Sequence, residues 1–282
     1  MLRLPGPLVT VDWLHRSLGD PSLRIADVRW ALSGPPGRER YDAGHLPGAV
    51  FLDVDTELAT PGAPTDGRHP LPSAAHLAEA LGTHGIGDDH VVVAYDDASG
   101  SIAARLWWLF RHFGRGSACA VLDGGIAAWA DAGLPLTTDE PSHPPATWTP
   151  RAARDDVADA DAVAAADERT LLLDARAAER YRGEIEPIDP RAGHVPGAVS
   201  APWTGNIGPD GRFLSADALR ARFGELGVEG REVVAYCGSG INATHDLLAL
   251  ELAGMGDGRL FAGSWSAWSS DPARPAATGP RP

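Results

Sequence analysis

One cysteine in this chain stands in a setting that could activate it. Cys237 lies between an apolar run of strand-forming residues (233–236) and a segment of helical composition (247–252). Gly238 and Gly240 allow backbone conformations that turn several N–H groups toward one point. Because such N–H groups and the start of a helix favour an anion, we predict a nucleophilic thiolate whose cradle could also hold a persulfide.

The alternative is a buried structural cysteine beside a glycine turn, which is the commoner role of a single cysteine at the end of a strand. The two glycines and the following helix favour the reactive interpretation for Cys237. Ligands of α/β sheets bind at the carboxyl ends of strands, so this position also gives the sulfur access to a substrate. The other cysteine, Cys119, lies in an apolar run (117–122) and is predicted to be an inert strand residue.

The composition narrows the possible partners and cofactors. The chain has 282 residues, enough for two ordinary domains, and a formal net charge of −14, which argues against nucleic acid or an anionic membrane as partner. Two cysteines imply no disulfide framework, and the ten histidines are scattered, so we expect neither a metal nor another cofactor. Without a signal-peptide pattern or a long apolar run, the expectation is a soluble, cytoplasmic monomer.

Four short motifs occur twice in the same order. They are Asp-x-Arg at 27–29 and 174–176, Gly-His-x-Pro-Gly-Ala-Val at 44–50 and 193–199, Val-Val-Ala-Tyr at 92–95 and 233–236, and Gly-x-x-x-Ala-Trp at 124–129 and 263–268. Chance is a poor explanation for four matches in one order, so we predict two copies of one domain. The predicted boundaries are 1–133 and 155–282, joined by a proline-rich, extended linker over 134–154.

Each copy has the pattern of alternating strands and helices. We expect helices over 11–18, 73–81, 157–166 and 215–223, and strands over 23–27, 90–95, 118–122, 170–174, 232–236 and 259–261. A further short strand is expected after each Gly-His-x-Pro-Gly-Ala-Val motif, and a turn at each Gly-x-x-x-Ala-Trp motif. This alternation predicts an α/β fold in which each domain is a mainly parallel, doubly wound sheet flanked by helices.

With these motifs the chain resembles the tandem-domain rhodaneses, the thiosulfate and 3-mercaptopyruvate sulfurtransferases, over nearly its whole length. The resemblance implies a catalytic C-terminal domain that carries sulfur as a Cys237 persulfide, and an N-terminal domain without the cysteine. Asp96 follows its strand where Cys237 follows the equivalent strand, and a carboxylate cannot carry sulfur. The implied partners are a small-molecule sulfur donor and a thiol or cyanide acceptor, and no cofactor is implied.

The loop after Cys237 distinguishes two activities within this family. Loops of the thiosulfate type carry cationic residues directly after the cysteine, whereas Gly238 and Ser239 stand there in this chain. The sequence Cys-Gly-Ser-Gly resembles the mercaptopyruvate type, in which a loop serine works with a histidine and an aspartate of the other domain. The matching residues are Ser239, His69 and Asp55. We therefore expect 3-mercaptopyruvate as donor, with a thiosulfate:cyanide sulfurtransferase as the alternative.

The same resemblance indicates which residues bind the donor. Arg180 best matches the family's anion-binding arginine, and a guanidinium group suits a carboxylate. Arg176 is expected to anchor a loop. The family's second donor-binding arginine has no clear equivalent in this chain, and Arg191 is the nearby candidate. The backbone expected to hold the persulfide belongs to Gly238, Gly240, Ile241, Asn242 and Ala243. Asn242 replaces the threonine usual in the family.

Several conspicuous residues have structural alternatives. His45 and His194 occur in both copies, including the one without cysteine, so they are predicted to be structural. A surface position is the alternative for His69, and a simple ion pair with Glu184 is the alternative for Arg180. Four tryptophans are predicted to lie in the core: Trp107, Trp108, Trp265 and Trp268.

Two other functions are alternatives to sulfur transfer. Cysteine phosphatases have a similar loop but need an arginine at the sixth position after the cysteine, where this chain has Ala243. A non-catalytic binding module is the third interpretation. The intact Cys237 loop argues against it for the second domain and leaves it open for the first.

Overall fold

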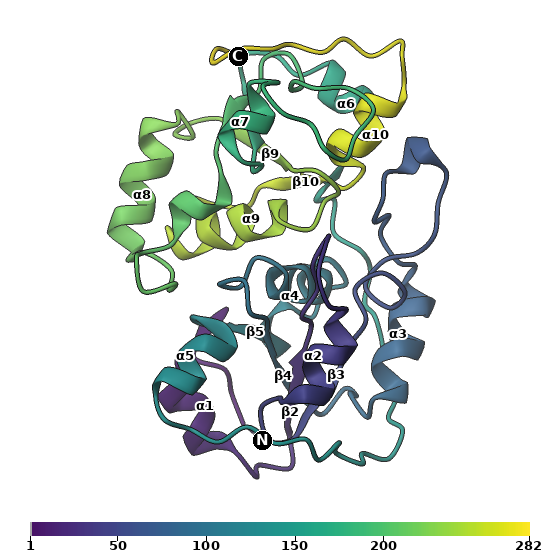
Figure 1. Cartoon of the computed structure of the whole chain (residues 1–282), viewed down its shortest axis with the longest axis vertical. Helices are drawn as coiled ribbons and strands as arrows, with labels where there is room; N and C mark the ends of the chain where they lie inside the picture. The colour runs from purple at the N-terminus through teal and green to yellow at the C-terminus, as the bar shows by residue number, and fades with distance from the viewer. Residues whose placement is uncertain (1) are drawn as a thin grey trace. The chain divides into compact units, whose positions relative to one another are not determined.

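The computed structural model describes residues 2–282, which form two compact units. Unit 1 comprises the chain up to Ala59 together with Pro72–Arg154 and Pro209–Arg212. Unit 2 comprises Thr60–Leu71, Asp155–Gly208 and Phe213–Pro282 (Figure 1). Over residues 2–282, no helix combines the length and the apolar character needed to cross a membrane.

Unit 1 is built on a five-stranded, wholly parallel sheet in the order β1-β5-β4-β2-β3. Its strands are β1 (Leu8–Val9), β2 (Leu23–Asp27), β3 (Ala49–Phe51), β4 (Val91–Tyr95) and β5 (Cys119–Leu122). Its helices are α1 (Val11–Ser17), α2 (Gly37–Ala43), α3 (Ala74–Thr83), α4 (Ala103–His112), η2 (Gly116–Ala118) and α5 (Gly125–Asp131). The central strand β4 is buried along its whole length, as its run of valines predicts.

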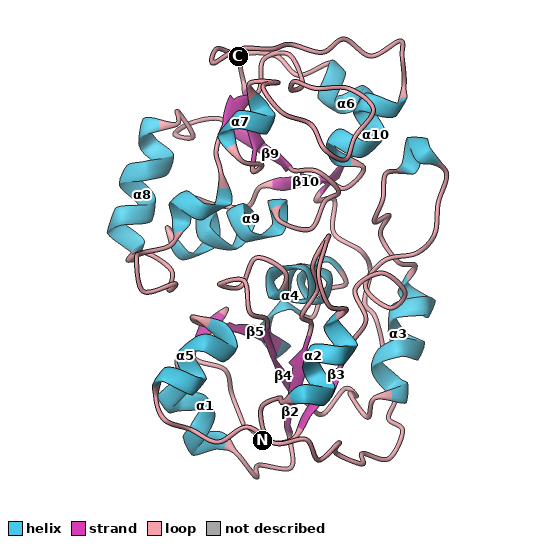
Figure 2. Cartoon of the chain, in the orientation of Figure 1, coloured by secondary structure: helices cyan, strands magenta, loops and turns pink. Residues whose placement is uncertain are grey.

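Unit 2 repeats this architecture with the strand order β6-β10-β9-β7-β8, all pairs parallel (Figure 2). Its strands are β6 (Val157–Ala158), β7 (Thr170–Asp174), β8 (Val199–Ser200), β9 (Glu232–Tyr236) and β10 (Arg259–Phe261). Its helices are η1 (Pro64–Asp66), α6 (Ala160–Ala164), α7 (Ala178–Tyr181), η3 (Trp203–Asn206), α8 (Ala216–Glu225), α9 (Ala243–Leu252) and α10 (Ser264–Ser270). The equivalent strand order in both sheets confirms the predicted duplication.

The predicted strands agree with the structure more closely than the predicted helices. Strands β2, β7, β9 and β10 have the predicted bounds. The helix predicted over 157–166 was wrong at its start, because Val157 and Ala158 form β6 and pair with β10. Asp159 then caps α6, its side chain accepting a hydrogen bond from the N–H of Ala162 at 2.7 Å. The Gly-x-x-x-Ala-Trp motifs form helices α5 and α10 rather than turns.

The predicted core is confirmed. The four tryptophans assigned to the core are each at most 1% exposed, and Cys119 is equally buried in β5. Burial raises the pKa of the Cys119 thiol far above its ordinary value, which agrees with an inert residue. Residues 134–154 contain no helix and no strand. Trp148 holds this segment on unit 1 through ring contacts with Phe110 and Phe113.

One segment of the first sequence copy belongs to unit 2. Residues Thr60–Leu71 leave unit 1 and pack on α10 through η1. A Cβ atom at Gly67, where φ is +88°, would lie 2.5 Å from the Gly263 carbonyl oxygen, so only glycine permits this approach. The backbone N–H of Arg68 donates to Ser266 Oγ at 3.1 Å. The segment therefore brings Arg68 and His69 into the unit that carries Cys237.

Candidate active site

Cys237 lies at the carboxyl end of the central strand β9 and directly before the loop that leads into α9. Its sulfur accepts a hydrogen bond from the N–H of Gly240 at 3.2 Å. Gly240 has φ +81°, and a Cβ atom there would lie 2.4 Å from the Ala262 carbonyl oxygen. A side chain at this position would collide with that carbonyl, so glycine allows the loop to turn the Gly240 N–H toward the sulfur.

The first turn of α10 fixes the Cys237 loop. Ser264 Oγ accepts from the Cys237 N–H at 3.1 Å and donates to the Phe261 carbonyl at 2.9 Å. The N–H groups of Trp265 and Ser266 donate to the carbonyls of Cys237 and Gly238 at 3.0 and 2.9 Å. The Gly-x-x-x-Ala-Trp motif of the second copy therefore positions Cys237, since it satisfies backbone groups of Cys237 and Gly238.

The equivalent loop of unit 1 shows what such a loop binds. Asp96 is fully buried, and its two carboxylate oxygens accept four backbone N–H groups at 2.8–2.9 Å. The donors are Ala98, Gly100, Ile102 and Ala103, and by alignment of the two copies the first three correspond to Ser239, Ile241 and Ala243. Ser99, with φ +56°, occupies the place of Gly240. The loop thus has the geometry of an anion cradle, filled in unit 1 by its own side chain.

Removing this internal anion is expected to destabilise unit 1. In Asp96→Ala, four buried N–H donors lose their acceptor, and each unsatisfied buried group costs about 1–3 kcal/mol. We expect the free energy of unfolding to fall by at least about 3 kcal/mol, measured by urea denaturation followed by circular dichroism. The matched control is Asp97→Ala, which removes only a partly exposed ion pair with Arg40 and should cost about 1 kcal/mol or less. Equal losses would contradict the cradle.

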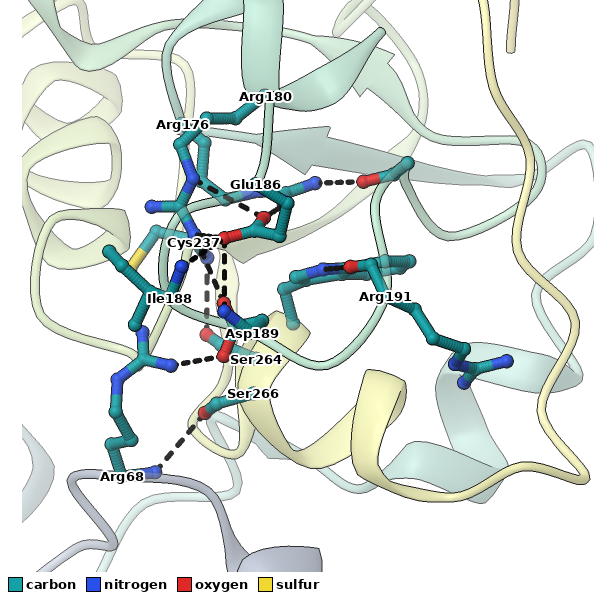
Figure 3. Close-up of polar contacts among 12 residues, drawn as sticks. Arg68, Arg176, Arg180, Glu186, Ile188, Asp189, Arg191, Cys237, Ser264 and Ser266 are labelled. Carbon is teal, nitrogen blue, oxygen red and sulfur yellow. Dashed lines mark hydrogen bonds and ion pairs between the residues drawn. The ribbon is translucent and has the colours of Figure 1, made fainter. Parts of the chain in front are cut away.

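A chain of ion pairs runs beside Cys237 in unit 2 (Figure 3). It links, in order, Asp174, Arg176, Glu186, Arg180, Asp189 and Arg68. Arg180 Nη2 lies 2.6 Å from Glu186 Oε1 and 3.0 Å from Asp189 Oδ2. Asp189 Oδ1 pairs with Arg68 Nη1. The carboxylates of Glu186 and Asp189 are almost fully buried, and each is paired with guanidinium groups. Burial raises the pKa of the Asp189 carboxyl, and the neighbouring Arg68 and Arg180 oppose this shift.

The alternative predicted for Arg180, an ion pair with Glu184, was wrong. Glu184 pairs with Arg182 at 2.7 Å, at an exposed position. Arg180 is instead only 14% exposed and lies against the Cys237 loop, with Nη1 3.5 Å from where a Cβ of Gly238 would be. The structure thus places the guanidinium group of Arg180 beside the Cys237 loop.

Two other arginines have structural contacts. Arg176 binds the Asp174 carboxylate and the Gly193 carbonyl, as Arg29 binds Asp27 and Gly44 in unit 1, which confirms its predicted anchoring role. The guanidinium group of Arg191 donates to four backbone carbonyls around the end of α10, at 2.7–2.9 Å. Arg191 therefore stabilises the end of α10, and because its guanidinium group is occupied by these carbonyls it is unsuited to bind a sulfur donor.

The three residues predicted to protonate the leaving group lie in different units. Ser239 and His69 are 6% and 5% exposed, and both belong to unit 2, so the surface alternative for His69 is excluded. Asp55 belongs to unit 1, where its carboxylate accepts from Trp30 Nε1 at 2.9 and 3.0 Å. Asn242 starts α9 at a partly exposed position without capping it through its side chain.

The two repeated histidines share two contacts in both units. His45 Nδ1 lies 2.9 Å from the Tyr41 carbonyl oxygen, and His194 Nδ1 lies 2.7 Å from that of Tyr181. Each imidazole is buried and stacks on the same tyrosine, with ring centroids 3.8 and 3.7 Å apart. These matching contacts agree with the predicted structural role.

Sequence reasoning missed the role of Arg68 and that of Asp189. Arg68 directly precedes His69, and its position beside Cys237 depends on the crossing of Thr60–Leu71 into unit 2. The only signal in the sequence was that the family's second donor arginine has no clear equivalent in this chain. Within residues 2–282, no group of three or more His, Cys, Asp or Glu side chains is arranged to hold a metal ion.

Comparison with known proteins gives a consistent result. A family model described as rhodanese-like domain matches the chain twice, at residues 10–132 and 158–271. The chain is 47% identical over 279 residues to a probable 3-mercaptopyruvate sulfurtransferase of Pseudomonas aeruginosa, covering 96% of this chain and 98% of that protein. It is 41% identical over 267 residues to a putative thiosulfate sulfurtransferase of Mycobacterium tuberculosis, covering 93% and 92%.

Solved structures show the same architecture. A 3-mercaptopyruvate sulfotransferase from Escherichia coli superposes with a TM-score of 0.82 at 30% identity, covering 92% of this chain and 99% of that chain. A 3-mercaptopyruvate sulfurtransferase from Leishmania major superposes with a TM-score of 0.83 at 28% identity, covering 96% of this chain and 76% of that chain.

Proposed function

Because this chain belongs to the rhodanese family of sulfurtransferases, we propose that it moves a sulfane sulfur from 3-mercaptopyruvate to a thiol or cyanide acceptor. The observation that carries this proposal is the position of Cys237. Its sulfur lies at the carboxyl end of β9, accepts a backbone N–H, and has the guanidinium group of Arg180 beside its loop. A nucleophile next to a cation suits a donor that carries both a transferable sulfur and an anionic group.

The first half-reaction forms the persulfide. The Cys237 thiolate attacks the sulfur of 3-mercaptopyruvate, an S–S bond forms, and the C–S bond of the donor breaks. The electron pair of that bond goes to carbon, which leaves as the enolate and becomes pyruvate when it takes up a proton. The N–H groups of Gly238, Gly240, Ile241, Asn242 and Ala243 are proposed to hold the persulfide, and the Asp96 loop of unit 1 supports this by analogy.

The second half-reaction regenerates the free Cys237 thiolate. The thiolate of an acceptor, or cyanide, attacks the outer sulfur of the persulfide. The S–S bond breaks, and its electron pair returns to Cys237 as the thiolate. Both steps are displacements at sulfur that need neither a metal nor an organic cofactor.

We propose that Ser239, His69 and Asp55 supply the proton that the enolate needs. Ser239 is two residues from the nucleophile, and the burial of His69 in the same unit supports a role inside the site. A serine hydroxyl oriented by a histidine and a carboxylate follows the logic of other catalytic triads.

The second candidate is sulfur transfer from thiosulfate, and two arginines near Cys237 favour it. Thiosulfate is a dianion, and Arg68 and Arg180 bring two guanidinium groups beside the Cys237 loop, which itself carries no cation. The relative from Mycobacterium tuberculosis is named a putative thiosulfate sulfurtransferase.

Steady-state kinetics with both donors and cyanide tests the proposed donor. We expect a higher kcat/KM with 3-mercaptopyruvate than with thiosulfate, because Ser239 can protonate the enolate while sulfite needs no proton to leave. Pyruvate and thiocyanate should appear in equal amounts. A higher kcat/KM with thiosulfate would establish the second candidate.

We also propose that the protein acts in the cytoplasm as a monomer. A reducing compartment supports the chemistry, because it keeps Cys237 and Cys119 as the free thiols that the structure contains. Light scattering coupled to size-exclusion chromatography tests the monomer, and a dimer mass would contradict it.

A further inference from the structure

A buried aspartate and a buried asparagine form a polar pair in the interior of unit 2. Asp246 lies in the first turn of α9 and Asn206 is the last residue of η3, and both side chains are fully buried. Helix α9 packs on η3 and on α8 (Figure 1). Asn206 Nδ2 donates to Asp246 Oδ1 at 2.6 Å and lies 3.2 Å from His245 Nδ1. Both hydrogens of this amide are therefore directed at side chains of α9.

Two oxygens of this pair have no donor. Asp246 Oδ2 and Asn206 Oδ1 are both buried, and within residues 2–282 neither has a hydrogen-bond partner. A buried polar atom without a partner destabilises the folded state. When Asp246 is ionised, both oxygens are acceptors and cannot bond to each other. One proton on Asp246 Oδ2 removes both defects, because the O–H can donate to Asn206 Oδ1.

We propose that Asp246 is a neutral carboxylic acid in the folded protein and forms a cyclic pair with the Asn206 amide. In this pair the amide N–H donates to one carboxyl oxygen, and the carboxyl O–H donates to the amide oxygen. The pair fixes the first turn of α9 to η3 only while the proton is present. Because Thr244 and His245 bond through their N–H groups to the end of the Cys237 loop, the proton supports the start of the helix that follows this loop.

The surroundings of Asp246 favour the neutral form. The charged and titratable groups that act on it are Arg222 of α8, Asp174 of β7 and, through the shared amide, His245 of α9. Burial raises the pKa of the Asp246 carboxyl to about 7; Arg222 opposes this shift and Asp174 adds to it. The Nη2 group of Arg222 donates to the Pro202 carbonyl at 2.8 Å.

The proton makes the stability of unit 2 depend on pH with a defined sign. In the unfolded chain an aspartate ionises at about pH 4, whereas folded Asp246 keeps its proton up to about pH 7. The stability that the proton contributes is therefore complete below about pH 4 and is lost as the pH rises through about 7. Asp246→Asn should abolish this loss, because its amide group can form both hydrogen bonds at every pH.

Urea denaturation of the full chain at pH 5 and pH 8, followed by circular dichroism, measures this dependence. Relative to Asp246→Asn, the unfolding constant of the wild type should rise about 10²-fold between these pH values. Asp246→Leu cannot pair with Asn206 and should be less stable than Asp246→Asn at both. The matched control is Asp217→Asn, the same chemical change at an exposed position of α8, whose difference from the wild type should be equal at both.

Hydrogen exchange locates the effect in unit 2. At pH 8 the backbone amides of α9 should exchange at least about tenfold more slowly in Asp246→Asn than in the wild type, and at pH 5 they should exchange alike. Comparing two proteins at one pH cancels the pH dependence of the exchange chemistry. Peptides of unit 1 are the internal reference and should exchange equally in both proteins.

A carbon-13 titration of the aspartate carboxyl groups reports the proton itself. The signal that is absent from Asp246→Asn should titrate near pH 7 in the wild type. A midpoint below about pH 5, close to that of a free aspartate, would overturn the proposal. An equal loss of stability in Asp246→Asn at both pH values would also overturn it. Equal stability of Asp246→Asn and Asp246→Leu would refute the pairing with Asn206. None of these outcomes depends on the proposed sulfur transfer.

Discussion

Cys237→Ser is expected to abolish sulfur transfer from either donor, a loss on the order of 10⁴-fold or more, as for other removed nucleophiles. A serine hydroxyl is far less acidic than a thiol and does not ionise near neutral pH, so no nucleophile remains. The fold should persist, because the serine oxygen can accept the Gly240 N–H that the sulfur accepts now. Steady-state thiocyanate production with each donor measures the loss.

The matched control is Cys119→Ser, which changes the other cysteine within β5. That thiol is 1% exposed, and its raised pKa makes it a poor nucleophile, so the variant should keep its kcat even if it is somewhat less stable. Circular dichroism and the urea midpoint of Cys237→Ser establish that it is folded. Residual transfer by folded Cys237→Ser, or loss of transfer in folded Cys119→Ser, would contradict the assignment.

Ser239→Ala should lower kcat/KM for 3-mercaptopyruvate by about 10²-fold, the typical cost of one contact made only in the transition state. We propose that the Ser239 hydroxyl protonates the enolate, which then leaves as pyruvate. In this proposal no other group donates a proton directly to the enolate. Sulfite leaves thiosulfate without taking up a proton, so thiosulfate turnover should change by less than about threefold. Kinetics with both donors on one enzyme preparation measures this difference.

Ser200→Ala is the matched control for Ser239→Ala. Ser200 lies in β8 of the same unit, is partly exposed, and its hydroxyl forms no hydrogen bond within residues 2–282. Neither donor should respond to this change. An equal loss for both donors in Ser239→Ala would mean that the serine supports the loop and does not protonate the leaving group.

The sequence predicted the architecture because the two copies repeat local signals. Runs such as 91–95 and 233–236 are buried on both faces of a parallel sheet, and that burial demands continuous apolar residues. The short helices α2 and α7 were missed, since a helix of four to seven residues has too few turns to show a period. Val157 and Ala158 were taken as helical because two residues carry no alternation, and only their pairing with β10 makes them a strand.

The loop around Cys237 was predictable from the sequence, but the side chains that surround it were not. Cys237, its glycines and the start of α9 are neighbours in sequence, so their spacing already indicated the loop. Arg68 reaches the same loop through a segment of the first sequence copy that packs in unit 2, a tertiary event without a local signal. Glu184 was the partner named in the alternative interpretation of Arg180 because it is near in sequence, but Glu186 and Asp189 are the partners.

The most direct test of the central claim is the mass of the intact protein after treatment with one equivalent of 3-mercaptopyruvate in the absence of acceptor. The claim is that sulfur travels on Cys237, and it predicts one added sulfur per chain, located at Cys237 by peptide mapping, with one equivalent of pyruvate released. Cyanide should then remove that sulfur as thiocyanate and restore the original mass. Sulfur found on Cys119, or pyruvate released without any gain in protein mass, would contradict it.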